Sequence, residues 1–244
     1  MRGASLSVAG PLAVLLLWEA LVRALEVPVY VLPAPSAILL KIESDAALML
    51  TGLAYTLMEA VVGYLIGGTV ALVVAMAFVL FPRVERYALP GLVALNSVPV
   101  VAFAPVALLW FGSGPASKIA MVTMAVGFAV FVNAHQGLRS VDEAAANLLR
   151  SFGAGPLRQM ALLRLPAALP AIMNGLRVGV VRSMIIAIVA EMLGAFKGLG
   201  FTIFESTQQV DFLRAWAAIA VASAVSMTWY GIVNWIDRRF VFWR

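Results

Sequence analysis

The side chains best suited to chemistry gather in one polar segment, Leu138–Pro170, which lies between two very apolar stretches of the sequence. Asp142 and Glu143 begin an alanine-rich run, and acids near its N-terminus favour a helix there. Gly153 suits the left-handed position that ends such a helix, and Pro156 suits the first position of another. We therefore expect two short helices joined by an exposed turn, a shape that binds a soluble partner through a few apolar anchors with a polar rim.

The second expected helix is short and has a mixed surface. Its apolar face holds Leu157, Met160 and Ala161, and Leu165-Pro166 is expected to end it. We expect the two short helices to lie at an angle to each other and nearly parallel to the membrane.

Catalytic chemistry has little support elsewhere in the sequence. There is no Gly-x-x-x-x-Gly-Lys-Ser/Thr stretch to cradle nucleotide phosphates, no His-Glu-x-x-His zinc motif and no Gly-x-Ser-x-Gly nucleophile elbow. Cysteine is absent, and the single His135 excludes a site built from several histidines. We expect His135 to be structural, because few acids lie in the apolar stretches to form a proton relay. The chain is predicted not to be an enzyme and to bind no metal or cofactor.

The composition requires a membrane. Of the 244 residues, 63% are hydrophobic and only 12% are charged, and the mean hydropathy is +1.00. Soluble domains are about 45–50% apolar and about 25% charged. A bilayer core about 30 Å thick is crossed by roughly 20 apolar residues. The predicted fold class is therefore an all-α integral membrane protein with about six transmembrane helices.

Six apolar stretches are long enough to be the spans. They lie near Val8–Leu25, Leu53–Phe81, Tyr87–Phe111, Ile119–Gly137, Ala171–Phe196 and Phe212–Ile236. Three prolines interrupt the third stretch, so it should be kinked and should face other helices. Pro82–Arg86 is expected to form a tight polar turn. Short amphipathic helices are expected at Ser36–Asp45, capped by Ser36, and at Phe201–Val210.

The basic residues predict the orientation, because arginine and lysine accumulate on the cytoplasmic side. If Leu138–Pro170 is cytoplasmic, six spans place both termini there too. The inner side then carries Arg2, Arg83, Arg86, Arg139, Arg150, Arg158, Arg164, Arg238, Arg239 and Arg244. The outer side carries only Arg23, Lys41, Lys118, Lys197 and Arg214.

A few polar residues fall inside the expected spans. Glu191 is costly in an apolar helix, so it should face a cavity or a partner group, with a structural hydrogen-bonding role preferred. Arg177 and Arg182 could line an inner vestibule that attracts anions, or could equally extend to lipid phosphates. Small residues four apart let helices approach closely, either within the subunit, which is preferred, or at a dimer seam; these are Gly63, Gly67, Gly175 and Gly179.

Taken together, the polar segment and several further stretches resemble the transmembrane subunit of a type I ABC importer. Those permeases carry a cytoplasmic loop with Glu-Ala-Ala, three residues, Gly, a longer gap and Leu-Pro; Gly153 and Leu165-Pro166 match it. Further stretches are similar to the nitrate, sulfonate and taurine permease branch. They are Val31–Ser36, Val98-Pro99 with Pro105, Trp110–Gly114 with Ser117–Ile119, Ala190–Met192 and Gly198–Gly200.

The loop departs from the family pattern at one point. Counting back from Gly153, the family's glutamate falls at Asn147, whereas the literal Glu143-Ala144-Ala145 lies four residues earlier. One helical turn separates the two positions, so either Glu143 or Asn147 could make the family's polar contact.

The resemblance implies a division of the chain and a set of partners. Residues 1–50 would hold an N-terminal transmembrane helix and a periplasmic amphipathic segment, and residues 51–240 the transmembrane domain with its coupling loop at about 138–170. Two ABC ATPase subunits would bind ATP and Mg²⁺ and dock on that loop. A second permease copy and a solute-binding protein would complete an importer for a sulfonate-, nitrate- or taurine-like anion or a vitamin precursor, in a bacterial or archaeal inner membrane.

The resemblance also implies which residues meet the ATPase. They are Asp142, Glu143, Asn147, Gly153, Ala154, Gly155, Arg158, Leu165 and Pro166. Two other functions stay open from the sequence: a secondary transporter driven by an ion gradient, and a membrane anchor that transports nothing. Few intramembrane acids disfavour the first, and proline and glycine breaks in several helices disfavour the second.

Overall fold

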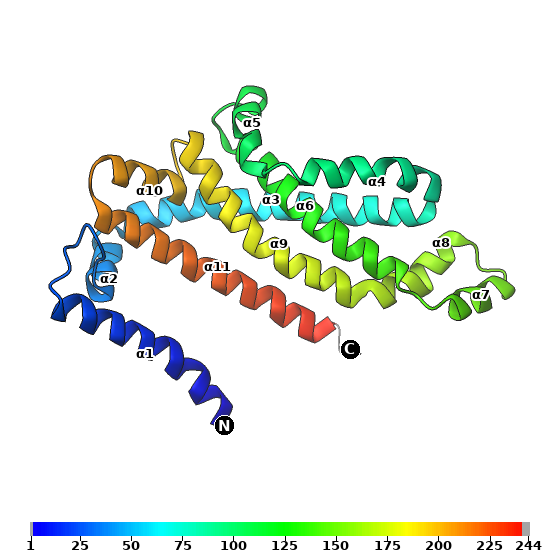
Figure 1. Ribbon diagram of the computed structural model, residues 1–244, viewed down its shortest axis with the longest axis horizontal. Coiled ribbons are helices and arrows are strands. Elements are labelled where there is room, and N and C mark those ends of the chain that lie inside the picture. The colour runs from blue at the N-terminus through cyan, green and yellow to red at the C-terminus, as the bar shows by residue number, and fades with distance from the viewer. Residues whose placement is uncertain (1, 241–244) are drawn as a thin grey trace.

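The chain folds into helices joined by short connections, as the computed structural model shows for residues 2–240 (Figure 1). Side chains are described from Gly10 to Arg239, so Arg244, and Arg2 with respect to its side chain, lie outside the described part. The helices are α1 (Arg2–Ala24), α2 (Pro35–Ser44), α3 (Ala46–Leu80), α4 (Pro82–Asn96), α5 (Ala104–Phe111), α6 (Pro115–Arg139), α7 (Glu143–Ser151), α8 (Pro156–Gln159), α9 (Leu165–Gly194), α10 (Leu199–Gln208) and α11 (Phe212–Phe240). A 3₁₀ turn at Val100–Phe103 precedes α5, and a π-helical turn at Met160–Arg164 joins α8 to α9.

Several of these helices can cross a membrane. Within residues 10–239, the helices α3, α6 and α11 are long and apolar enough to do so. Two bent pairs raise the number to five: α4 with Val100–Phe111, bent by 89°, and Pro156–Gly194 with α10, bent by 47°. The all-helical membrane class is confirmed, and so is the kink in the third stretch. The predicted first span at Val8–Leu25 falls partly outside the residues with described side chains.

The centre of the molecule is a bundle of α3, α6 and α9 (Figure 1). Glycine makes the close contacts possible. A Cβ added to Gly63 would lie 2.6 Å from the Val122 side chain, and one added to Gly67 would lie 2.6 Å from the carbonyl oxygen of Thr123. On α9, a Cβ at Gly175 would lie 2.9 Å from that of Asn133. These contacts are all within the chain, where small residues let backbones approach.

At the opposite end from α7 and α8, the short helices α2 and α10 pack against α11 (Figure 1). Ion pairs join them, with Arg214 Nε 2.7 Å and Lys41 Nζ 3.1 Å from the Asp45 carboxylate. Although partial burial raises the pKa of Asp45, the hydrogen bonds from Arg214 and Lys41 outweigh it and hold that pKa below its usual value. This corner is therefore held by charge as well as by apolar packing.

Four local predictions were wrong. Ser36 does not cap α2, which begins after Ala34; instead its N–H and hydroxyl donate to Glu19 of α1 at 3.0 and 2.7 Å. Pro82–Arg86 is not a turn but the start of α4, because proline is favourable in a first helical turn.

The other two errors concern helix ends. Leu165-Pro166 does not end a helix, since the π turn carries the spiral from α8 into α9 and places Pro166 in the first turn of α9, so α8 is not a separate short helix. The fourth expected span begins earlier than Ile119, since α6 starts at Pro115, so Lys118 lies within the helix and is 1% exposed.

Candidate functional site

The loop helices, α7 and α8, form the end of the molecule farthest from α10 (Figure 1). The Asp142 side chain caps α7 by accepting a hydrogen bond from the Ala144 N–H at 3.2 Å. At the other end Gly153 has φ +77°, and its N–H donates to Arg150 O while the Ala154 N–H donates to Leu149 O, each at 2.9 Å. This pair of bonds is a Schellman cap, which favours glycine in the left-handed position. Nothing lies within 4 Å of a Cβ built on Gly153, so only its backbone conformation requires glycine.

The loop helices expose large apolar side chains. Phe152 is 76%, Leu157 73% and Leu148 59% exposed. Charged residues on the same segment, Arg150 and Arg158, are exposed as well. Apolar anchors surrounded by polar groups are the arrangement of a protein-binding surface.

Inside the loop, hydrogen bonds fix its position on the membrane helices. The buried Gln159 donates from Nε2 to the Ala154 carbonyl at 2.8 Å, which holds the turn against α8. Arg164 donates to the Leu138 carbonyl at 2.9 Å and so satisfies an end of α6. The π turn then continues α8 into α9, so the loop is attached to one long helix without a flexible joint.

The predicted loop residues lie close together in sequence but differ in exposure. Glu143 and Asn147 are both exposed, one turn apart on α7, and Asn147 accepts a hydrogen bond from Arg150 at 3.1 Å. The geometry leaves both available to a partner. The others divide simply: Asp142, Gly153, Gly155, Arg158 and Pro166 are exposed, Leu165 is half-buried and Ala154 is buried.

A second polar region lies near the opposite end of α3, α6 and α9. It is named the outer polar cluster after the side on which the sequence predicts it. It consists of Thr56, Glu59, Lys118, Glu191 and the backbone of Gly198–Gly200. Its centre is Glu191, 1% exposed, as expected of an acid that faces partner groups. The Glu191 carboxyl accepts hydrogen bonds from the Thr56 hydroxyl at 2.7 Å and from the Gly200 N–H at 2.7 Å, while Thr56 accepts from the Leu199 N–H at 2.9 Å.

Sequence reasoning missed three members of this cluster, Thr56, Glu59 and Lys118. Lys118 donates to the carbonyls of Ser113 at 2.8 Å and Gly194 at 2.7 Å. Glu59, 3% exposed, contacts the Glu191 carboxyl, and its Oε2 has no hydrogen-bond partner in the described part of the chain. An acid inside an apolar stretch, four residues before Gly63, was the signal that could have identified Glu59.

The Gly198-Leu199-Gly200 stretch packs so closely against this cluster that two of its positions have no room for a side chain. Gly198 has φ +114°, and a Cβ there would lie 2.2 Å from the Glu191 carboxyl carbon. A Cβ on Gly200 would lie 2.2 Å from the Ile188 carbonyl oxygen. Both glycines are thus required for α10 to seat against Glu191.

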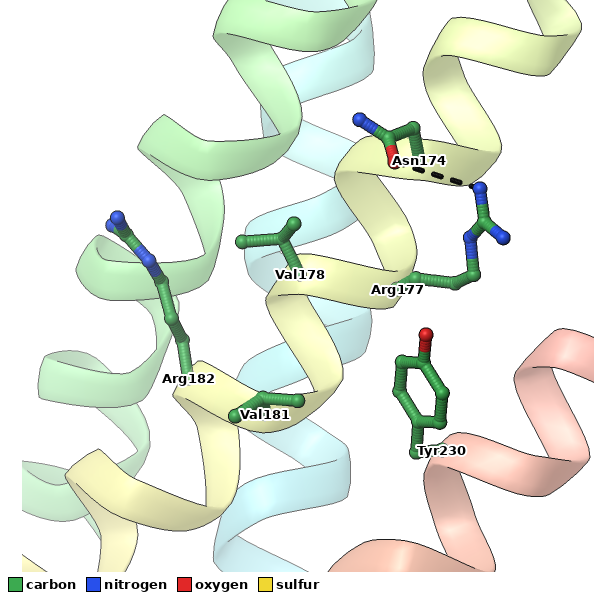
Figure 2. Close-up of a pocket in the computed structure, with 6 residues that line it drawn as sticks. All are labelled: Asn174, Arg177, Val178, Val181, Arg182 and Tyr230. Carbon is green, nitrogen blue, oxygen red and sulfur yellow. Dashed lines mark hydrogen bonds between the residues drawn. The ribbon is translucent and has the colours of Figure 1, made fainter. Parts of the chain in front are cut away.

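A third polar region is a hollow of about 500 Å³ beside α9 and α11, shown in Figure 2. Asn174, Arg177, Val178, Val181, Arg182 and Tyr230 line it. Its two guanidinium groups point to opposite sides, with the valines between them (Figure 2). Arg177 lies 3.3 Å from the Asp237 carboxylate and 3.4 Å from the Asn174 side-chain oxygen. Arg182 is exposed and has no ion pair or hydrogen bond in the described part of the chain.

His135 lies apart from these regions and has partners of its own. Its Nε2 is 3.0 Å from the buried Glu85 carboxylate, which Arg139 also contacts at 2.8 Å, and its ring stacks on Phe131 at 5.5 Å. Among the residues with described side chains, no group of three or more His, Cys, Asp or Glu could hold a metal ion. Of the three polar regions, the loop helices are suited to docking a partner. The outer polar cluster is suited to holding helices together, and the hollow beside α9 and α11 is suited to attracting an ion.

Comparison with known protein families identifies the family to which this chain belongs. The model described as "Binding-protein-dependent transport system inner membrane component" matches residues 67–242, which is more than half of the chain.

Named relatives match over nearly the whole length. A probable ABC transporter permease protein of Haemophilus influenzae is 33% identical and covers 93% of each chain. The formylaminopyrimidine transport permease protein ThiX of Halalkalibacterium halodurans is 30% identical, covering 96% of this chain and 93% of that one. A putative aliphatic sulfonates transport permease protein, SsuC of Bacillus subtilis, is 28% identical, covering 96% and 86%.

Solved structures agree on the fold. A chain of the MetNI methionine ABC transporter, solved in inward-facing conformations, superposes with a TM-score of 0.69. It covers 81% of this chain and 98% of its own length at 18% sequence identity, so the likeness concerns architecture.

Proposed function

This chain belongs to the family of inner membrane components of binding-protein-dependent transport systems, and we propose that it is driven by ATP hydrolysis on separate subunits that dock on its loop helices. It is an ABC-type permease, a protein of transmembrane transport. The observation that carries the proposal is the exposed apolar surface of α7 and α8, joined to α9 without a break.

Docking of an ATPase on this surface fits its chemistry. Phe152 and Leu157 are large apolar groups with most of their surface free, and such anchors contribute most of the energy of an interface. Glu143, Asn147 and Arg158 would form the polar rim. ATP and Mg²⁺ would bind to two ATPase subunits, one for each permease copy.

Motion of the ATPase would reach the pathway through α9. Since α8, the π turn and α9 form one continuous helix, a displacement of the loop displaces α9 as well. Alternation of the pathway needs two global states in which the docked subunits make different contacts. ATP-bound and ATP-free subunits would supply that difference.

The orientation follows from the same assignment. The loop helices face the cytoplasm, and the outer polar cluster lies toward the outer surface of a bacterial or archaeal inner membrane. Both termini lie on the cytoplasmic side, as the distribution of arginine favours.

Two further partners complete the importer. A second permease subunit, most simply another copy of this chain, would enclose the pathway, and a solute-binding protein would deliver the substrate from outside. The named relatives handle aliphatic sulfonates or a formylaminopyrimidine. A small solute of that size range, either a sulfonate-like anion or a vitamin precursor, is the proposed cargo.

The loop assignment is tested by Gly153→Val in the complete transporter, with ATP-dependent uptake measured in proteoliposomes. Valine is β-branched and tolerates φ +77° poorly, so the Schellman cap should be lost and the surface of the loop helices distorted. We expect uptake to fall at least about tenfold, the loss of roughly 1.4 kcal/mol of productive contact.

Gly153→Asn is the matched control, because asparagine adds a side chain at the same place yet adopts the left-handed conformation. It should keep most of the uptake. Normal uptake by Gly153→Val, with the ATPase still co-purifying, would contradict coupling through this loop.

A further inference from the structure

The two arginines of the hollow beside α9 and α11 differ in their partners. Arg177 is half-buried and is neutralised by Asp237 at 3.3 Å. Arg182 is exposed, and nothing in the described part of the chain pairs with it. Of the two guanidinium charges that border the hollow, only that of Arg182 is left uncompensated (Figure 2).

Arg182 lies too deep along α9 for its guanidinium group to extend to the membrane surface. The helix α9 ends at Gly194, just before the exposed Lys197, and Arg182 lies twelve residues earlier. At about 1.5 Å per residue this is about 18 Å below the outer end, close to the middle of a hydrocarbon core about 30 Å thick. Arginine reaches the interface from positions near helix ends, whereas a charge at mid-depth faces water or a partner.

The exposed side chains on this part of α9 form one continuous face. They are Asn174, Val178, Val181, Arg182 and Ile185, at spacings of three, four and one residue. The hollow on that face, about 500 Å³, has the size of small-molecule sites, which combine apolar walls with a few polar groups.

We propose that Arg182 is a binding group for a small anionic solute in the water-filled pathway of the permease. The inference rests on the proposed function and selects the anion from the two substrate classes named there. The two valines supply apolar walls, and a guanidinium at low dielectric attracts a carboxylate, sulfonate or phosphate strongly. Asp237 does not oppose this attraction, because its charge is matched by Arg177.

The chain has no cysteine of its own, so a single introduced cysteine reports on this site directly. The substitution Val178→Cys, one helical turn from Arg182, is made in the full complex and placed in membrane vesicles. Its reaction rates are measured with two thiol reagents of similar size: anionic sulfonatoethyl methanethiosulfonate and cationic trimethylammonioethyl methanethiosulfonate. Both need water to reach the thiol.

We expect the introduced thiol to react with both reagents and to favour the anionic one. Changing Arg182→Gln in the same chain should lower the ratio of anionic to cationic rates by about fivefold. This is the effect of a unit charge about 6 Å away in a largely aqueous, salt-screened space. Arg182→Lys keeps the charge and should keep the ratio, which makes it the matched control.

Two results would overturn the proposal. An introduced thiol that reacts with neither reagent would mean that lipid or protein covers this face. An unchanged ratio in Arg182→Gln, with the complex assembled as judged by size-exclusion chromatography, would mean that Arg182 does not set the charge of the pathway.

Failure here is distinguishable from failure of the proposed function. The labelling requires only the chain in a membrane, whereas the Gly153 variants test ATP-driven uptake. Loss of uptake in Gly153→Val, with an unreactive thiol in Val178→Cys, would reject the anion site alone. Normal uptake in Gly153→Val, with charge-selective labelling of Val178→Cys, would reject the coupling loop alone.

Discussion

The outer polar cluster and the loop helices are both rich in polar groups, yet the side chains that define them differ in exposure: those of the cluster are buried, and those of the loop are exposed. In the cluster Thr56, Lys118 and Glu191 are each at most 1% exposed. Thr56 and Glu191 accept hydrogen bonds from N–H groups of α10, and Lys118 donates to the Gly194 carbonyl at the end of α9. In the loop helices Phe152 and Leu157 stand largely free. Apart from Glu59 Oε2, the cluster pairs its polar groups within the described part of the chain, and the loop leaves its contacts unmade.

The difference separates the region that holds the helices together from the region that is proposed to bind the ATPase. A buried charge must find its partners in the fold, because an unpaired one costs several kcal/mol. An exposed apolar group carries no such requirement and gains its free energy only when another protein covers it. Substitutions in the cluster should therefore reduce stability, and substitutions in the loop should reduce association.

The largest effect is expected for Glu191→Ala. It removes the acceptor for Thr56 and for the Gly200 N–H and leaves Lys118 without a nearby countercharge from α9. We expect unfolding of the purified chain in detergent to become easier by about 3–5 kcal/mol, seen as a lower midpoint in thermal unfolding. A midpoint equal to that of the unaltered chain would show that the cluster does not hold α10 in place.

The next effect is expected for Phe152→Ser combined with Leu157→Ser. The affinity for the ATPase should fall at least about tenfold, because buried aromatic and apolar anchors dominate an interface, while thermal stability should change by no more than about 0.5 kcal/mol. Affinity is measured by titrating the ATPase onto the permease in nanodiscs. Leu40→Ser, at an exposed position of α2 at the other end, is the control and should leave affinity unchanged.

A smaller effect is expected for Glu59→Gln. Glu59 lies beside Glu191, but its Oε2 has no hydrogen-bond partner in the described part of the chain. The amide keeps the shape and leaves the contacts of Glu191 in place, so the loss of stability should be about 1 kcal/mol or less. A loss as large as that of Glu191→Ala, in the same thermal assay, would show that Glu59 is an equal anchor.

The smallest effect concerns the ion pairs of Asp45. Its pKa in the folded chain is lowered, so the stabilisation is present above the pKa of the unfolded chain and is lost as the pH falls through the folded value. Thermal midpoints of the unaltered chain and of Asp45→Asn should differ at pH 7 and converge below about pH 4. Glu43→Gln, at an exposed neighbouring residue, should show no such convergence, and a constant gap for Asp45→Asn would contradict the assignment.

Sequence reasoning reached the fold and the loop better than the cluster. Apolar stretches of about 20 residues predict spans, and Gly153 predicts the end of α7, because both signals are local. The continuation of α8 into α9 was missed because proline in a first helical turn resembles a stop signal. The burial of Lys118 was missed, because only the packing of α6 against α9 brings the Gly194 carbonyl to it.

The π-helical turn at Met160–Arg164 also sets an angle. A π turn is equivalent to one residue inserted into an α-helix, and each α-helical residue rotates the chain by about 100°. The direction in which the exposed Leu157 points is thus phased against the direction in which the exposed Arg182 points by a single residue. Deleting one residue there would keep the spiral continuous yet turn Leu157 by more than a quarter of a circle about the helix axis, away from the ATPase subunit that is proposed to dock on it.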